Sequence, residues 1–183
     1  MTRKAFTFLR GFARNESASM AIAAAIWIPA YLFLIISSVE LGMWTARHTM
    51  LEHGLDTTVR DVRLGTGTIY DRDSLRDTIC ERAIILPNCQ QNLMLEMVRL
   101  DIRNFTPPSS DYACADVSTY GAGDEVRPAV AFQYGRENEL MLLRACFQYE
   151  PVSPGFGLAE YLQTDGAGLL DLKSQAAFVH EPL

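Results

Sequence analysis

The sequence predicts an α+β protein: a long N-terminal transmembrane helix that continues into a stalk, then a small exported domain with a second helix on an antiparallel sheet. Three observations lead to this fold class. Residues 20–39 carry no charge, residues 41–62 place apolar side chains at helical spacing, and segments after residue 92 have the length and patterning of strands.

The uncharged run has the length of a membrane-spanning helix. Its 20 residues, Met20 to Val39, rise roughly 30 Å, which matches the hydrocarbon core of a bilayer. A cleaved secretory signal has an apolar core of about 7–15 residues and a small-x-small site, whereas this run ends in the letters SSVEL. We therefore expect an uncut anchor, kinked at Pro29, which membrane helices tolerate.

Charge predicts the orientation of this anchor. Four Lys/Arg precede the span and only Arg47 lies in the 15 residues after it, which places the amino terminus in the cytoplasm. The net charge is −6, and the chain from Glu40 onward holds 12 basic and 21 acidic residues, a poor match for nucleic acid. We expect a cytoplasmic tail (1–18), a transmembrane helix (19–39), an amphipathic helical stalk (40–64) and a periplasmic α+β domain (65–183).

The four cysteines all lie on the exported side, which favours two disulfides. Four cysteines allow three pairings; we favour Cys80 with Cys89, closing a short loop, which leaves Cys114 with Cys146. Zinc is the competing interpretation, but gaps of 9, 25 and 32 residues do not fit its usual paired spacing. We expect neither a metal nor a cofactor.

The stalk carries one stripe of side chains at gaps of three or four residues, as on one face of a helix. We expect residues 19–63 to form one rod of roughly 68 Å, ended by Gly65-Thr66-Gly67. The stripe either packs on the protein's own domain or also packs against neighbouring rods. Its members are Leu41, Trp44, His48, Leu51, Leu55, Val59 and Val62.

The exported domain should contain one further helix and several strands. Asp71 or Asp73 is the expected cap of the helix. The expected elements are a helix from about Asp73 to Ile85, a strand at Leu93–Val98, a hairpin of Val130–Tyr134 with Leu140–Tyr149, and a short strand at Ala176–Val179.

Catalytic motifs are missing from the sequence. His48 and His53 have the spacing HxxxEH, which is neither of the zinc-protease patterns, and no nucleophile elbow or Walker loop is present. The sequence therefore predicts a non-enzymatic protein, with an anchored periplasmic ligand-binding or enzymatic domain as the alternative.

Several stretches resemble one known family. They are SSVELGMWTARHTMLEHGLDTTVRDVRLGTG, ICERAIILPNC, LEMVRLDIRNF, ELMLLRACFQYEPVSPGFGL and SQAAFVHEP. Together they resemble the TadE-like proteins of the tight-adherence (Flp pilus) system over nearly the whole chain.

The resemblance implies a minor pilin or pseudopilin of the bacterial inner membrane. Its implied partners are membrane lipid and other pilins or pilus assembly proteins, contacted through the N-terminal helix. Members of the family are typically cut after a Gly and carry a Glu at the fifth mature position. Here Ala21 or Ala23 stands where that Glu is expected; cutting after Gly11 would place Glu16 at the fifth position.

Overall fold

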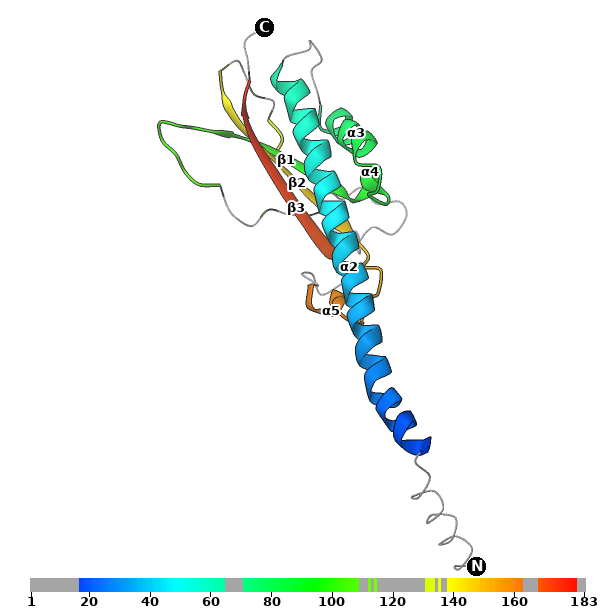
Figure 1. Ribbon diagram of the computed structural model, residues 1–183. Coiled ribbons are helices and arrows are strands. Elements are labelled where there is room, and N and C mark those ends of the chain that lie inside the picture. The colour runs from blue at the N-terminus through cyan, green and yellow to red at the C-terminus, as the bar shows by residue number, and fades with distance from the viewer. Residues whose placement is uncertain are drawn as a thin grey trace, which may run out of the picture.

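The fold is α+β, as predicted (Figure 1). The structure is a computed structural model that describes residues 17–64, 71–108, 112, 114, 131–133, 135, 138–162 and 168–180. Its elements are α2 (Ser17–Arg63), α3 (Arg72–Arg82), α4 (Cys89–Asn92), β1 (Leu93–Leu100), β2 (Leu140–Tyr149), α5 (Ala159–Leu162) and β3 (Leu170–Val179).

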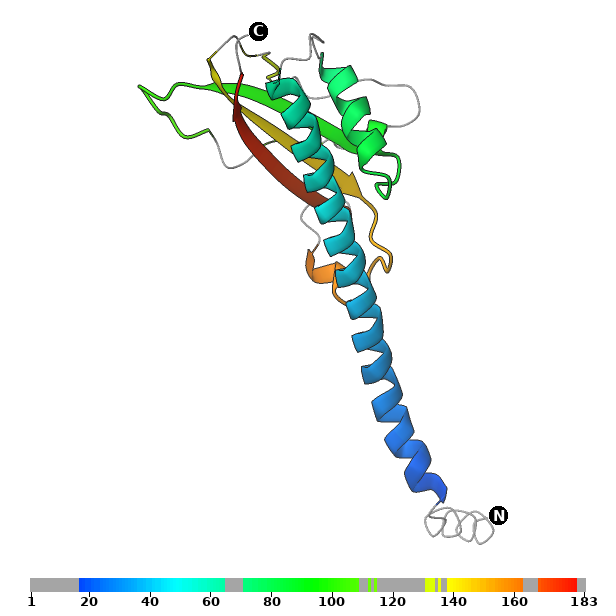
Figure 2. The same cartoon turned by 45° about the horizontal axis from the view of Figure 1, so that its top comes forward.

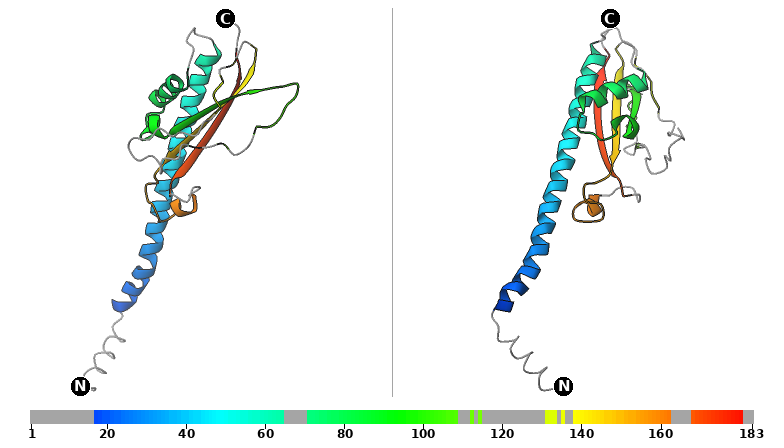
Figure 3. Two further views of the ribbon diagram at one scale, coloured as in Figure 1. Left: turned by 180° about the vertical axis from the view of Figure 1, so that it is seen from behind. Right: turned by 90° about the vertical axis from the view of Figure 1, so that its right-hand side faces the viewer.

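A single helix, α2, runs through both the uncharged run and the predicted stalk. It has 47 residues and continues through Pro29, so it is about 70 Å long. The expected rod of residues 19–63 is thus confirmed, with a start two residues earlier. The N-terminal half of α2 projects away from the other elements, whereas its C-terminal half lies along the sheet (Figures 1 and 3).

The sheet has three antiparallel strands in the order β1-β2-β3. The expected strand at Leu140–Tyr149 is β2, with the same bounds, and it occupies the centre. The short C-terminal strand expected at Ala176–Val179 is part of the longer β3. Because β2 is buried on both faces, it reads as an almost continuous apolar run.

The predicted hairpin between Val130–Tyr134 and β2 is wrong. Both edges of β2 are occupied, one by β1 and the other by β3. Phe132 instead forms an isolated parallel bridge with Met97 of β1. The Met97 amide donates to the Ala131 carbonyl and the Gln133 amide donates to the Met97 carbonyl, both at 3.0 Å. The short segment 131–133 therefore lies beside β1.

Helix α3 begins where its cap predicts. The Asp71 carboxylate accepts a 2.8 Å hydrogen bond from the Ser74 amide, as an N-cap does. The helix ends three residues before the expected Ile85, because the backbone leaves helical geometry at Ala83. Pro87 disfavours helix in the residue before it, and the chain turns back there to bring Cys89 to Cys80.

We call α2 from Glu40 onward, together with all later elements, the head. Its core is formed by α2 and α3 packed on one face of the sheet. Gly54 allows the two helices to approach closely, since a Cβ there would lie 3.0 Å from the Ile79 carbonyl oxygen. The predicted boundary at residue 64 therefore divides elements that share one hydrophobic core.

Candidate functional site: the junction of the apolar helix and the head

The stripe on α2 is covered mainly by the protein's own domain. Leu51, Leu55, Val59 and Val62 are buried in the head's core, with Leu51 completely inaccessible and Leu55 only 1% exposed. Trp44 packs against the edge of this core, and Leu41 is half-exposed. The alternative of rod-to-rod packing is therefore not open to the four buried residues.

His48 lies at the margin of the stripe. Its ring stacks on Trp44, with centroids 5.4 Å apart, and its Nδ1 lies 3.5 Å from a Glu52 carboxylate oxygen. Both His48 and Glu52 remain partly exposed. These contacts give the ring a role in helix packing.

Toward its N-terminus, α2 presents bare apolar surface. It is long and apolar enough to cross a membrane by length and composition, and none of its most apolar 18-residue window is buried. Water is a poor solvent for a surface of this size, and such patches mark interaction sites. The large exposed side chains are Met20, Ile22, Ile26, Trp27, Ile28, Tyr31, Leu32, Phe33, Leu34, Ile35 and Val39.

Glu40 follows this surface directly, yet it is 1% exposed. Its Oε1 accepts a hydrogen bond from the Val152 amide at 3.3 Å, and its Oε2 accepts from the Ser153 amide at 3.1 Å and the Ser153 hydroxyl at 3.2 Å. A buried carboxylate needs such donors, because an unpaired one would be strongly destabilising. Glu40 therefore holds the segment after β2 against α2.

We call this segment, residues 151–162, the foot; it leads from β2 into α5 and lies beside α2 (Figure 2). The Phe156 ring meets the Phe33 ring edge-on, with centroids 5.9 Å apart. Gly157 lies so close to α2 that an added Cβ would be 3.1 Å from the Ser37 hydroxyl, and its φ of +69° also favours glycine. The foot therefore follows α2 from Glu40 back to Phe33.

Sequence reasoning missed Glu40 and the foot. None of the expected elements lies in the foot, which contains the short helix α5. The only signal for Glu40 was its position, as the first charged residue after the uncharged run. No local pattern connects a helical glutamate with amides 112 and 113 residues later.

Arg47 of α2 and Tyr149 at the end of β2 form a cation–π contact near this junction. The Arg47 guanidinium carbon is 4.3 Å from the centre of the Tyr149 ring. Burial raises the pKa of the Tyr149 hydroxyl, and the positive charge of Arg47 opposes that shift. Tyr149 therefore stays protonated at neutral pH, and the stacked pair joins the end of β2 to α2.

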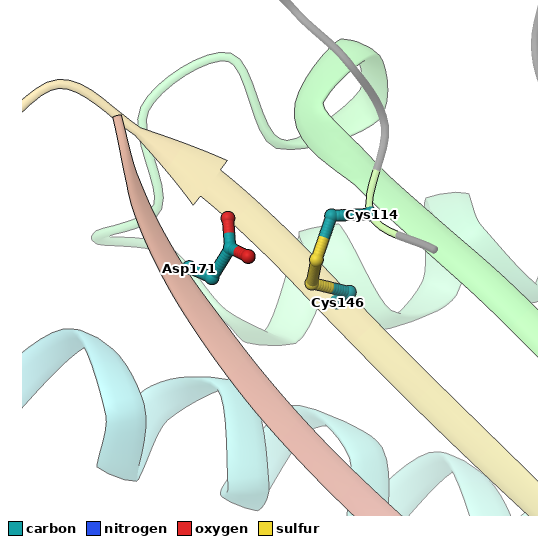
Figure 4. Close-up of side chains that lie close together, drawn as sticks. All are labelled: Cys114, Cys146 and Asp171. Carbon is teal, nitrogen blue, oxygen red and sulfur yellow. A yellow bond between two sulfur atoms is a disulfide. The ribbon is translucent and has the colours of Figure 1, made fainter. Parts of the chain in front are cut away.

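The four cysteines form the two favoured disulfides, Cys80–Cys89 and Cys114–Cys146. Asp171 lies near the second, with ligand atoms of the three residues within 4.8 Å of one another (Figure 4). The disulfide removes the thiolates that would bind a metal, and Asp171 already accepts a 2.9 Å hydrogen bond from Gln148. This cluster therefore fits a covalent crosslink of the sheet better than a metal centre.

The face of the sheet away from α2 contains buried polar side chains, among them Arg144 and Gln148. Arg144 and Glu96, directly opposite each other on β2 and β1, form an ion pair at 3.2 Å. Tyr112 lies over this face, with Arg144 and Lys173 5.1 and 5.5 Å from its ring centre. Burial raises the pKa of Tyr112 and Arg144 opposes the shift. These contacts hold Tyr112 against the sheet.

Open pockets of about 470 and 460 Å³ lie beside α2 in the described part of the chain. The first is lined by Asp56, Val59, Arg60, Arg63, Leu64, Ala177 and Phe178, and the second by His53, Thr57, Arg60, Asp61 and Arg82. In the second, Arg82 pairs with Asp61, and the Thr57 hydroxyl donates to the His53 carbonyl. Three of the side chains that line the second pocket, those of Arg82, Asp61 and Thr57, therefore already have partners in the protein.

Gly11 and Glu16, the residues of the expected processing site, lie outside the described residues. Comparisons with protein families, with curated proteins and with solved structures find no match. The structure itself defines the class: an α+β protein with one long apolar N-terminal helix and a disulfide-bonded head. Such a helix suggests a single-pass anchor, and such disulfides suggest an exported head.

Proposed function

We propose that this chain is a non-enzymatic, membrane-anchored minor pilin or pseudopilin that assists assembly of a Flp-type pilus. The observation that carries the proposal is the division of α2. One unbroken helix has an uncharged, exposed N-terminal half, while its C-terminal half forms part of the head's core. The resemblance of the sequence to TadE-like proteins supplies the particular system.

The division of α2 suits an assembly component. Because the head shares a core with the helix, the helix cannot rotate without the head. An apolar half-helix in lipid meets lipid tails or other apolar helices, and close packing and interhelical contacts favour the latter. Lateral association through Met20–Val39 would therefore set the relative positions of the heads.

In this proposal, the anchor spans the inner membrane with its amino terminus in the cytoplasm and its head in the periplasm. Two measurements test that placement, and a third tests whether the chain is uncut. The protein should stay in the membrane pellet after alkaline carbonate extraction, and protease added to spheroplasts should reach the head. The mass of the unreduced protein should match an uncut chain with two disulfides. A soluble polypeptide that begins beyond Val39 would contradict the anchor.

Helix-to-helix contact is tested by crosslinking in cells that assemble the pilus. All four native cysteines are in disulfides, so an added cysteine is the only free thiol. Leu34→Cys, on the exposed apolar half at 64% exposure, should give a covalent adduct with a second copy or another membrane protein of the assembly. Leu51→Cys, buried in the head, is the matched control and should not react.

The absence of crosslinks at two exposed positions would contradict the proposal. If Leu34→Cys and Ile26→Cys both yield monomer alone while pili are intact, lateral contact through this helix is wrong. Both side chains are well exposed on α2, at 64% and 67%, so a failure at both would not reflect intramolecular burial.

A further inference from the structure

The foot runs toward the apolar half of α2 and not away from it. Its start, at Val152 and Ser153, bonds to Glu40, and its turn, at Phe156, contacts Phe33. Phe33 and Glu40 are seven positions apart on α2, which corresponds to about 10 Å along the helix axis. The foot therefore descends beside the last two turns of the uncharged run.

Apolar side chains make up much of the exposed surface of the foot, and Glu160 is its one charged residue. Val152 is 53% exposed, Phe156 47% and Tyr161 81%. The nine residues from Pro151 to Ala159 carry no charge. Since Phe156 lies against the half-exposed Phe33, this surface is continuous with the apolar surface of α2.

The foot also bonds many of its own backbone donors, which a segment leaving water requires. The Val152 and Ser153 amides donate to Glu40. The Phe156 amide donates to the Ser153 carbonyl, and the Tyr161 and Leu162 amides both donate to the Leu158 carbonyl. These bonds satisfy five backbone amides of the foot, so their burial would cost less than that of unpaired groups.

We propose that the foot rests in the headgroup–acyl boundary of the bilayer leaflet on the head's side, with Val152, Phe156 and Tyr161 immersed in lipid. This inference rests on the proposed membrane anchor. If the hydrocarbon core ends at Val39, Phe33 lies about 9 Å below that edge. Interfacial segments bury their apolar side chains about 5–10 Å into this boundary, so the level of Phe156 fits such a segment.

A second attachment to the bilayer would restrict the tilt and rotation of α2. A single helix leaves its tilt and rotation in the bilayer to be set by flanking anchors. The foot adds such an anchor on one side of α2, and aromatic side chains favour this interface. The head would therefore face a defined direction relative to the membrane before any partner binds.

The test uses depth-dependent fluorescence quenching of the full chain in phosphatidylcholine–phosphatidylglycerol vesicles with brominated acyl chains. The reporters are single tryptophans, made in a Trp27→Phe, Trp44→Phe background. Phe156→Trp reports the foot, and Tyr161→Trp, at a side chain that is 81% exposed, repeats the measurement without altering packing. Ile102→Trp is the matched control, because Ile102 is 70% exposed and follows β1 at the end of the sheet away from the foot.

A fourth variant, Trp44→Phe alone, keeps Trp27 and reports the anchor. We expect lipids brominated near the headgroup to quench both foot reporters at least threefold more than Ile102→Trp, and deeper bromines to quench Trp27. If Trp27 is quenched while both foot reporters behave like Ile102→Trp, the foot proposal is overturned and the anchor stands. If Trp27 is not quenched, the anchor itself fails, and the foot proposal with it.

Discussion

Replacing Glu40 by glutamine should release the start of the foot without unfolding the head. The amide is nearly isosteric with the carboxyl, but it has one acceptor oxygen. If that oxygen takes the place of Oε2, the two bonds from Ser153 persist and the new NH₂ faces the Val152 amide. One bond to a buried acceptor is lost and two donors oppose each other.

The structure sets the size of this effect. A hydrogen bond to a charged group contributes about 1.5–3 kcal/mol. The Val152 bond is long, at 3.3 Å, so the lower part of that range applies. A loss of about 2 kcal/mol in the local opening free energy corresponds to roughly 30-fold faster exchange of the Val152 amide. The Ser153 amide should change less.

Amide hydrogen exchange of the full chain in detergent micelles measures this difference directly. Amides of the central strand, such as Phe147, should keep their protection, which shows that the head is intact. Glu52→Gln is the matched control, because Glu52 is on the same helix but 56% exposed and faces His48. Val152 protection within threefold of the wild type in Glu40→Gln would refute the role assigned to Glu40.

Three further predictions concern the packing of the head, each read from thermal unfolding in detergent. Gly54→Val should lower the free energy of unfolding by about 1–3 kcal/mol, because the new side chain overpacks against the Ile79 carbonyl. Gly42→Val is the control and should be nearly neutral, since nothing lies within 4 Å of an added Cβ there. Equal effects of the two substitutions would contradict the close approach of α2 and α3. Leu55→Ala should cost about 2–5 kcal/mol because it leaves a cavity in the core, and a loss below 1 kcal/mol would argue against that packing. Hydrogen bonding to Ser74 lowers the pKa of Asp71 below 3.8. The capping contribution of Asp71 is therefore complete above that pH and is lost as the pH falls through the lowered value. Asp71→Asn should flatten the acid dependence of unfolding below pH 3.8, and an unchanged profile would count against the cap.

Much of the fold follows from local sequence patterns. The uncharged run and the stripe predict α2 within two residues at its start, because helical periodicity repeats over many turns. The Asp71 cap and the bounds of β2 follow in the same way. Each of these features depends on residues within a few positions of one another.

Strand pairing is different, because a strand's edge can accept more than one neighbour. Val130–Tyr134 and β2 lie close in sequence and suggest a hairpin, but β1 and β3 pair with β2 over eight and ten residues. These longer ladders bury more apolar surface against α2 and α3 than a five-residue hairpin arm would. The pairing was therefore decided by the packing of the whole head.

By itself, the sequence determined that this protein has a continuous apolar-to-amphipathic helix and four cysteines beyond it. Those properties depend on composition and on spacing along one element. Only the tertiary structure decided that Glu40 is buried and that the foot lies against Phe33. Both depend on contacts between residues more than 110 positions apart in the chain. Periodicity within one helix predicts which face of that helix is apolar, but it does not identify the distant backbone amides that a carboxylate contacts.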